Sequence, residues 1–150
     1  MGAYRTVLVG TDGSESSMRA VDRAGGMAAD ASGKLIIATG YLRHEDDLRA
    51  ADALKDEGYM VHGKAPIYAM LREAHARATA AGATNIEERS IEDAPVHALV
   101  HLAAEVEADL LVVGNVGLHA RRAILARLFS VPGQVSSKAK SDVLIVHTTD

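Results

Sequence analysis

Short apolar runs alternate with amphipathic stretches along most of the chain. The run Val7-Leu8-Val9 is apolar and β-branched, stops at Gly10 and predicts a strand over 4–10. Further apolar runs predict strands over 35–38, 86–91, 110–113 and 143–147. The run over 86–91 alternates with polar positions, so we expect that strand near an edge of the sheet.

Between these runs, apolar side chains recur at the spacing of a helix face. Small and apolar residues from Met18 to Ala28 predict a first helix, which Ser14 or Ser16 caps. Three more helices are predicted, from Pro66 to Gly82, from Pro95 to Val106 and over 132–140. In the helix from Pro95 to Val106, we expect the inward face to carry Val96, Leu99, Val100, Ala103 and Val106.

Strands and helices therefore follow one another in strict alternation. Continuous apolar strands between amphipathic helices indicate a parallel sheet that is covered on both faces. Right-handed crossovers then give a doubly wound α/β fold with a five-stranded, mostly parallel sheet. The 150 residues fit one domain, predicted over 1–150. The polar connection 43–64 interrupts the alternation, and we expect it to serve as a lid or a partner surface.

Composition removes several classes of function. Hydrophobic residues make up 48% and charged residues 24%, which is typical of a globular protein. The absence of cysteine excludes a disulfide framework, a thiolate metal site and a cysteine nucleophile. No apolar run could cross a membrane and no secretion leader opens the sequence, so we expect a cytoplasmic protein without a membrane partner. Aromatic content of 3% argues against a nucleic-acid partner.

Two glycine turns follow the first and the fourth predicted strands. The turns 10–14 (GTDGS) and 114–117 (GNVG) lie where open α/β sheets bind ligands. Glycine lets a backbone approach a ligand closely, and free N–H groups at a helix N-terminus attract anions. Neither turn is a dinucleotide or P-loop fingerprint, and Asp12 suits a ribose hydroxyl or a metal better than a pyrophosphate. From spacing alone, a purely structural pair of turns stays an alternative.

Together with a third stretch, these turns resemble the universal stress protein family. The matching segments are 7–14, 110–117, and Ser130-Val131 followed by a helix and the strand 142–146. The resemblance covers the whole chain and is nearest to small actinobacterial members, some of which bind cyclic AMP and ATP. It implies a five-stranded parallel sheet and a homodimer formed through the last strand, which runs from Val143 to His147.

The resemblance also implies an adenine nucleotide site, whose base and ribose side falls on the first two strands. Gly10 and Thr11 would flank the base, and Asp12 would meet the ribose. The backbone near Gly40, after the second strand, would meet the adenine.

The phosphate side of that site would follow the family pattern G-x2-G-x9-G-[ST]. Gly114 and Gly117, with Asn115 between them, match its first two glycines and would let a phosphate approach. Ser130 matches its hydroxyl residue, and Val131 follows it.

The chain departs from the pattern before its last two positions. Twelve residues, 118–129, separate Gly117 from Ser130, two more than the pattern has, and Phe129 stands where a glycine is expected. Phenylalanine adds bulk where backbone should touch phosphate, so recognition of adenosine is better supported than recognition of phosphate. Arginines of this segment either replace the missing phosphate contacts or lie on a surface helix.

Three functions compete. The first is a non-catalytic stress or signalling protein that senses or sequesters cAMP, AMP or ATP and requires no cofactor, with Mg²⁺ accompanying ATP. The second is a dimeric interaction module with a decayed pocket. The third is a weak ATP hydrolase, which needs a base that the sequence does not supply, so we predict no catalytic residue. His97, His101 and Glu105 share one helix face, which is predicted to be a solvated face rather than a metal site.

Overall fold

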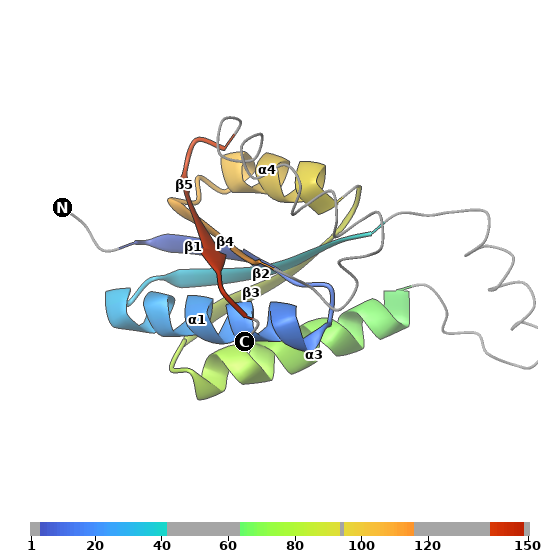
Figure 1. The fold of residues 1–150 in the computed structure, drawn as a ribbon, viewed down its shortest axis with the longest axis horizontal. Helices are drawn as coiled ribbons and strands as arrows, with labels where there is room; N and C mark the ends of the chain where they lie inside the picture. The colour runs from blue at the N-terminus through green and yellow to red at the C-terminus, as the bar shows by residue number, and fades with distance from the viewer. Residues whose placement is uncertain (1–3, 42–63, 94, 116–138, 149–150) are drawn as a thin grey trace, which may run out of the picture.

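The computed structural model describes residues 4–41, 64–93, 95–115 and 139–148. These residues form a five-stranded sheet with helices on both faces (Figure 1). The strands are β1 (Thr6–Gly10), β2 (Lys34–Tyr41), β3 (Asn85–Glu92), β4 (Leu110–Gly114) and β5 (Asp142–Val146). The helices are α1 (Glu15–Ala31), α3 (Lys64–Ala80) and α4 (Pro95–Glu105).

Every pair of neighbouring strands is parallel, in the order β3-β2-β1-β4-β5. β1 lies at the centre, where Leu8 pairs with Ile36 of β2 and with Leu111 of β4. The chain builds from β1 outward to β3 and then returns to place β4 on the other side of β1. The predicted doubly wound fold is confirmed, and the sheet is parallel throughout.

Alternate residues of the central strand pack against opposite helix layers. Val7 and Val9 join a buried cluster with α1 and α3, whereas Leu8 joins a second cluster with α4. Figure 1 shows α1 and α3 below the sheet and α4 above it. All three side chains are 0% exposed. Burial on both faces explains why this strand is apolar at every position.

The ends of α1 and α3 follow from local sequence signals. Ser14 is the N-cap of α1, because its Oγ accepts a hydrogen bond from the backbone N–H of Ser17 at 3.2 Å. Ser14 rather than Ser16 therefore fills the role that the sequence left open between them. Gly82, with a φ of +111°, follows α3 in the left-handed region that glycine adopts without strain.

α4 buries a face that differs in part from the predicted one. Ala98 and Leu102 are 1% exposed, although the apolar spacing had not placed them inward. Val100 and Val106, which were expected inside, are only partly buried. A small side chain lets a helix backbone come close to a sheet. Ala98 therefore faces the sheet together with Leu99 and Leu102.

β2 runs past its predicted end at Ala38. It pairs with β3 without interruption as far as Tyr41, opposite Glu92. Gly40 was expected after this strand and lies inside it instead, because pairing with β3 continues through Gly40, opposite Ile91, although glycine itself has a low strand propensity. β5 ends one residue earlier than expected, at Val146.

Some predicted features fall outside the described residues. This is the case for 43–63 of the polar connection, whereas Lys64 opens α3. The predicted helix over 132–140 lies mostly outside them too, and its last two residues, Ala139 and Lys140, are not helical. None of the helices that the structure describes is both long and apolar enough to cross a bilayer.

Candidate functional site

The turn between β1 and α1 and the residue that follows β4 belong to the same edge of the sheet. β1 and β4 are adjacent parallel strands, paired from Val7 opposite Leu110 to Val9 opposite Val112. The crossovers change direction between them, because β2 and β3 lie on one side of β1 while β4 and β5 lie on the other. Ligands of open α/β sheets bind beyond the carboxyl ends of the strands at such a point. This edge is therefore the candidate site.

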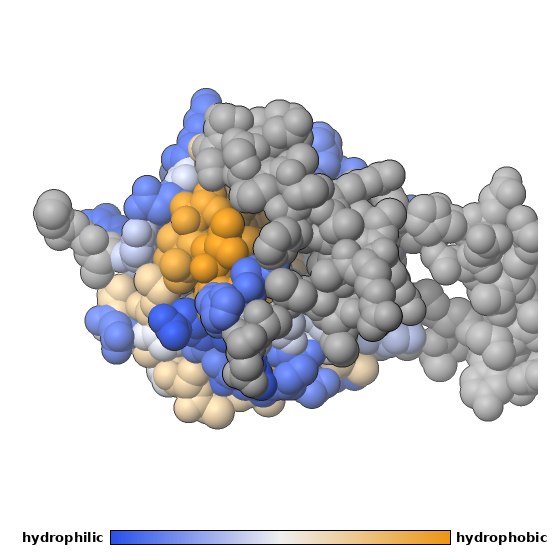
Figure 2. Space-filling view, viewed as in Figure 1, coloured by the Kyte–Doolittle hydropathy of each residue, from blue (hydrophilic) through white to orange (hydrophobic). Residues whose placement is uncertain are grey.

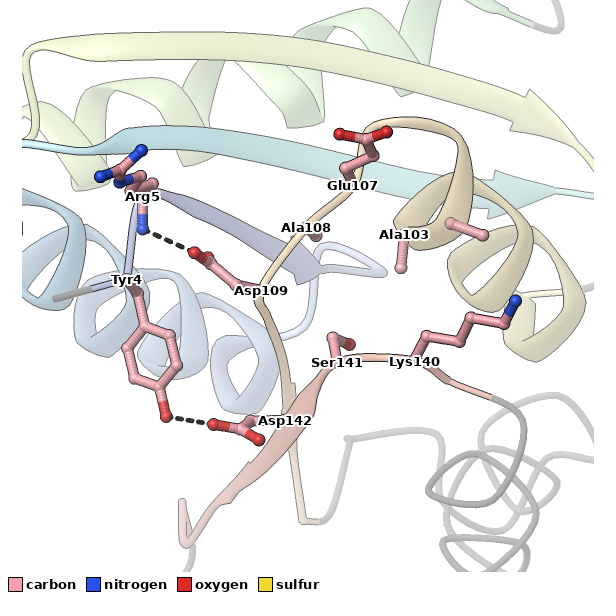
Figure 3. A pocket seen from close by; sticks show the side chains of 10 residues that line it. Tyr4, Arg5, Ala103, Glu107, Ala108, Asp109, Lys140, Ser141 and Asp142 are labelled. Atoms are coloured by element: carbon pink, nitrogen blue, oxygen red, sulfur yellow. Dashed lines mark hydrogen bonds between the residues drawn. The ribbon is translucent and has the colours of Figure 1, made fainter. Parts of the chain in front are cut away.

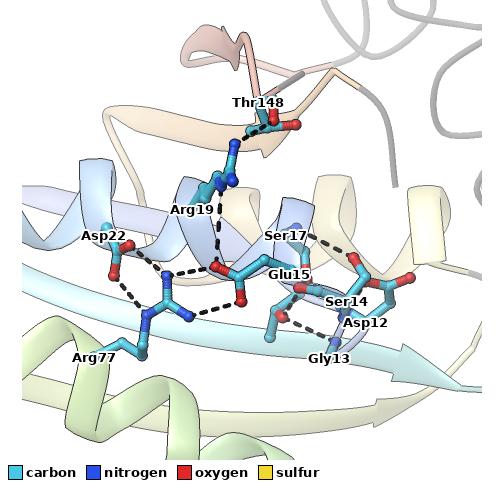
Figure 4. Close-up of polar contacts among 10 residues, drawn as sticks. Asp12, Gly13, Ser14, Glu15, Ser17, Arg19, Asp22, Arg77 and Thr148 are labelled. Atoms are coloured by element: carbon cyan, nitrogen blue, oxygen red, sulfur yellow. Dashed lines mark hydrogen bonds and ion pairs between the residues drawn. The ribbon is translucent and has the colours of Figure 1, made fainter. Parts of the chain in front are cut away.

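Asp12 is held in place by the start of α1 (Figure 4). Its Oδ1 accepts hydrogen bonds from the backbone N–H of Ser14 at 3.0 Å and from the Ser14 hydroxyl at 2.6 Å. Its own N–H donates to Oγ of Ser17 at 3.2 Å. Its other oxygen, Oδ2, is buried and has no hydrogen-bond partner among the described residues. A buried carboxylate oxygen without a donor costs free energy that a ligand hydroxyl would recover.

Thr11 stabilises the same turn through hydrogen bonds to three other residues. Its N–H donates to the carbonyl of Ala38 at 3.0 Å, and its Oγ1 lies 2.8 Å from Oγ of Ser17. The hydroxyl also accepts a hydrogen bond from the N–H of Gly13 at 3.1 Å. Because these contacts engage both its N–H and its hydroxyl, Thr11 holds the turn 10–14 in a fixed conformation.

Two glycines of this turn have packing reasons of their own. A Cβ on residue 10 would lie 2.6 Å from Cδ1 of Leu99, so Gly10 makes room for α4. Gly13 has a φ of +86°, and a Cβ there would lie 2.7 Å from Sδ of Met70. The sequence assigned Gly10 to the ligand, and the structure adds a reason for glycine there that needs no ligand.

Gly40 and Gly114 lie at the same edge as Asp12. Gly10 pairs with Ala38, so Gly40, two residues further along β2, comes level with Asp12 in the register. Gly114 ends β4. A Cβ on it would lie 3.4 Å from both the carbonyl oxygen and Oγ of Ser16, which is ordinary contact. The structure thus brings these three predicted residues to one edge.

Asn115, also predicted at the site, is bonded to the chain that follows β5. Its N–H donates to the carbonyl of Val146 at 2.8 Å. Its Oδ1 accepts from the N–H of Thr148 at 2.7 Å and from the Thr148 hydroxyl at 2.9 Å. Its Nδ2 lies 3.1 Å from Nδ1 of His147. Thr148 was missed by the sequence analysis, because no spacing relates a residue after the last strand to the turn after β4.

The remaining predicted residues, Gly117, Ser130 and Val131, lie outside the described residues, as does Phe129. The phosphate side of the site beyond Asn115 therefore stays a prediction.

A network of charges joins α3 to the first turns of α1 beside this edge (Figure 4). Arg77 donates to both carboxylate oxygens of Asp22, from Nε at 3.0 Å and from Nη2 at 2.5 Å. It also reaches Glu15 at 3.1 Å. These hydrogen bonds, first to Asp22 and then to Glu15, raise the pKa of the Arg77 guanidinium above its usual value. The network ties α1 to α3, so that the helix following the turn of Asp12 is anchored to its neighbour.

Among the described residues, no three or more His, Asp or Glu side chains are grouped so that they could hold a metal ion. His97 and His101 are exposed on α4, where their rings stack with centroids 6.3 Å apart. Nδ1 of His97 lies 2.5 Å from Oδ2 of Asp93. Glu105 is exposed as well, so the three side chains lie on the solvent-facing side of α4.

A hollow of about 830 Å³ opens at the opposite, amino-terminal edge of the sheet (Figure 3). Two of its carboxylates already have partners. Asp109 accepts hydrogen bonds from the N–H groups of Arg5 and Thr6, both at 2.9 Å, and Asp142 accepts one from the Tyr4 hydroxyl at 2.7 Å. The latter bond raises the pKa of the Tyr4 phenol. These carboxylates fasten β1 to β4 and β5, so the hollow is less suited to a ligand than the edge at Asp12.

The sequence model of the universal stress protein family matches residues 3–147. A universal stress protein of Mycobacterium tuberculosis is 63% identical over 150 residues, which cover 99% of this chain and 100% of that protein.

Solved structures show the same likeness. The crystal structure of a universal stress protein in complex with cAMP is 61% identical, with a TM-score of 0.74 over 99% of this chain and 100% of that one. The universal stress protein from Archaeoglobus fulgidus in complex with dAMP is 20% identical, with a TM-score of 0.63 over 95% and 98% of the two chains. At that identity the second likeness supports the fold alone.

Proposed function

The chain belongs to the universal stress protein family, and from this premise we propose that it binds an adenine nucleotide at the carboxyl edge of its sheet. The carboxylate of Asp12 carries the proposal. One of its oxygens is fixed by Ser14, and the other is buried without a partner among the described residues. A ribose hydroxyl is a donor of the right kind for that oxygen. The similar protein solved in complex with cAMP supports the choice of ligand.

The rest of the nucleotide has room along the same edge. The backbone of β2 at Gly40, level with Asp12, would meet the adenine. The turn that begins at Gly114 would receive the phosphate, because glycine has no side chain to keep the phosphate away from the backbone. Because Phe129 and the longer segment 118–129 disfavour a triphosphate, we place cAMP and AMP before ATP, and only ATP would bring Mg²⁺ with it.

We propose binding without turnover, which makes the protein a sensor or a store of nucleotide. ATP hydrolysis needs a group that positions the attacking water and donors for the developing charge. Asp12 is the one carboxylate of the turn 10–14, and Ser14 already occupies one of its oxygens. Adenine nucleotides are made and consumed in the cytoplasm, so we place the protein there.

The last strand supports a homodimer. β5 forms one edge of the sheet, and an apolar patch lies over it (Figure 2). Ile145 is 43% exposed there, between partly buried Leu144 and buried Val146. The other edge, β3, carries Glu87 and Arg89 in ion pairs at 2.7 and 3.1 Å. Charges on an edge strand prevent pairing, whereas an apolar edge invites it. We therefore place the subunit interface at β5.

Calorimetric titration of cAMP, AMP, ATP and GTP into the purified protein tests the nucleotide proposal. We expect adenine nucleotides to bind and GTP to bind far more weakly. Asp12→Asn keeps the shape of the side chain and an acceptor for Ser14 but replaces the second oxygen with a donor. It should therefore weaken binding at least tenfold, which is about 1.4 kcal/mol. Asp30→Asn, at an exposed position near the other end of α1, removes a carboxylate elsewhere and should change nothing.

Each outcome has a definite meaning. If no adenine nucleotide binds at any attainable concentration, the proposed function is wrong and the dimeric interaction module becomes the better interpretation. If nucleotides bind equally well to wild type and Asp12→Asn, the site lies elsewhere. Release of ADP from ATP with Mg²⁺, above the rate in buffer and abolished by Asp12→Asn, would replace the binding protein with a hydrolase.

A further inference from the structure

Thr148, two residues past the end of β5, is 6% exposed and bonded to three parts of the fold. Its hydroxyl lies within hydrogen-bonding distance of Oγ of Ser16. The same hydroxyl and the N–H of Thr148 both donate to Oδ1 of Asn115, at 2.9 and 2.7 Å. Its carbonyl accepts from Nη1 of Arg19 at 2.9 Å (Figure 4).

These contacts join two segments that border the proposed nucleotide site. Ser16 and Arg19 belong to the first turns of α1, which follow the turn of Asp12. Asn115 belongs to the turn that follows β4. Thr148 lies between the two segments, and its Cγ2 is 3.6 Å from where a Cβ on Gly114 would stand. It therefore sets how far the turn after β4 stands from the start of α1.

We propose that Thr148 is a positioning residue for the phosphate side of the nucleotide site. It would act through Asn115 and Ser16, because its hydroxyl, N–H and carbonyl are already engaged with protein groups. The inference rests on the proposed function. It adds that a residue beyond the last strand holds the turn at Gly114 in its binding position before the ligand arrives.

The physical argument is pre-organisation. A turn that follows a strand end has few backbone hydrogen bonds of its own, and ordering it when the ligand binds reduces affinity. Two hydrogen bonds from Thr148 to a single side-chain oxygen fix the Asn115 side chain. The bond between the N–H of Asn115 and Val146 fixes its backbone. Loss of the hydroxyl would leave one bond to Oδ1 and none to Ser16.

The test compares Thr148→Val with Thr148→Ser. Valine keeps the shape and loses the hydroxyl, and serine keeps the hydroxyl. By calorimetry, we expect Thr148→Val to weaken cAMP binding about tenfold and Thr148→Ser to stay within about twofold of wild type. Adenosine has no phosphate, so its affinity for Thr148→Val should be unchanged. A merely structural role would lower both affinities together. Thr79→Val, at an exposed threonine of α3 whose hydroxyl donates to the carbonyl of His75 at 3.0 Å, controls for the chemical change.

A second variant guards against misfolding. Ser16→Ala removes the other end of the contact and favours the helix, so it should also weaken cAMP while sparing adenosine. Combined with Thr148→Val, it should add little, because both remove the same contact. The inference is wrong if both variants bind cAMP as wild type does, or if cAMP and adenosine weaken in parallel in Ser16→Ala. If wild type itself binds no nucleotide, the proposed function fails before this comparison is made.

Discussion

A Cβ on Gly25 would lie 3.1 Å from the Cα of Ala78, so α1 and α3 pack backbone to backbone at this glycine. At its neighbour Gly26, a Cβ would have no atom within 4 Å apart from the adjacent backbone of α1 itself. We expect Gly26→Ala to stabilise the protein by about 0.5–1 kcal/mol through helix propensity. Gly25→Ala should destabilise it by about 1 kcal/mol, because a packed helix backbone has to move. Thermal and urea unfolding of both variants measure the difference.

The two glycines make a matched pair, since both lie in the interior of α1. Equal stabilisation of the two variants would mean that α1 and α3 do not approach as described.

At the candidate site, Gly114→Ala should weaken nucleotide binding without lowering the stability of the fold. The added methyl makes only ordinary contact with Ser16, so the melting temperature should stay within about 2 °C of wild type. It would, however, stand where the backbone has to approach the ligand. The Kd for cAMP should therefore rise about tenfold, or about 1.4 kcal/mol. Calorimetry of Gly114→Ala beside Gly26→Ala checks this, and unchanged affinity would move the phosphate away from β4.

Phe129 and the segment before it should decide which nucleotide is preferred. Each N–H to phosphate contact that the segment fails to make is worth roughly 1.5–3 kcal/mol, because it is charge-assisted. Wild type should therefore bind cAMP or AMP more tightly than ATP. Deleting two residues from 118–128 together with Phe129→Gly should raise affinity for ATP more than for cAMP. Tighter binding of ATP by wild type would show that the arginines of 118–129 supply the phosphate contacts instead.

Glu87 should make stability depend on acid pH. Its hydrogen bonds to Lys34 and then to Arg89 lower its pKa from the usual 4.5. A lowered carboxyl pKa gives stability that is present above the unfolded value and is lost as pH falls through the folded one. Because these groups are a third or more exposed, Glu87→Gln should cost only about 1 kcal/mol at pH 7. Urea unfolding should show this difference shrink as the pH falls below 4.5 and vanish once the pH lies below the lowered, folded pKa of Glu87. Glu73→Gln, at an exposed position of α3, is the control.

The subunit interface should respond to a charge on the apolar edge. Ile145→Lys places an ammonium group where a partner strand would lie, so light scattering should show a monomer in place of the dimer. Tyr68→Lys, at a residue of α3 that is 44% exposed against 43% for Ile145, should leave the dimer intact. A wild-type protein that is monomeric at high concentration would remove the interface at β5.

Most of the fold could be predicted because its signals are local. The run at Val7 to Val9 is apolar throughout, since both faces of β1 are covered, and the cap at Ser14 lies next to the helix that it begins. β2 ran past its expected end because pairing with β3 carries the strand through Gly40 to Tyr41.

The candidate site could be predicted only where a single turn supplies it. Asp12 and Gly114 follow apolar runs, so the rule about strand ends located them. The contact between Asn115 and Thr148 spans 33 positions and follows no periodicity. The glycine at position 10 could not be interpreted from the sequence alone. Close packing of Leu99 requires a glycine there, and so would close approach of a ligand.

The contrast between the two outer strands limits how far copies of this chain can assemble. Only one edge of the sheet, β5, favours pairing with another strand. If two β5 edges pair about a twofold axis, the joined sheet ends in β3 on both sides. Each of those ends carries the ion pairs of Glu87 with Lys34 and Arg89. An assembly formed through β5 would therefore close at two copies, and the charged strand β3 would keep it from growing into a fibre.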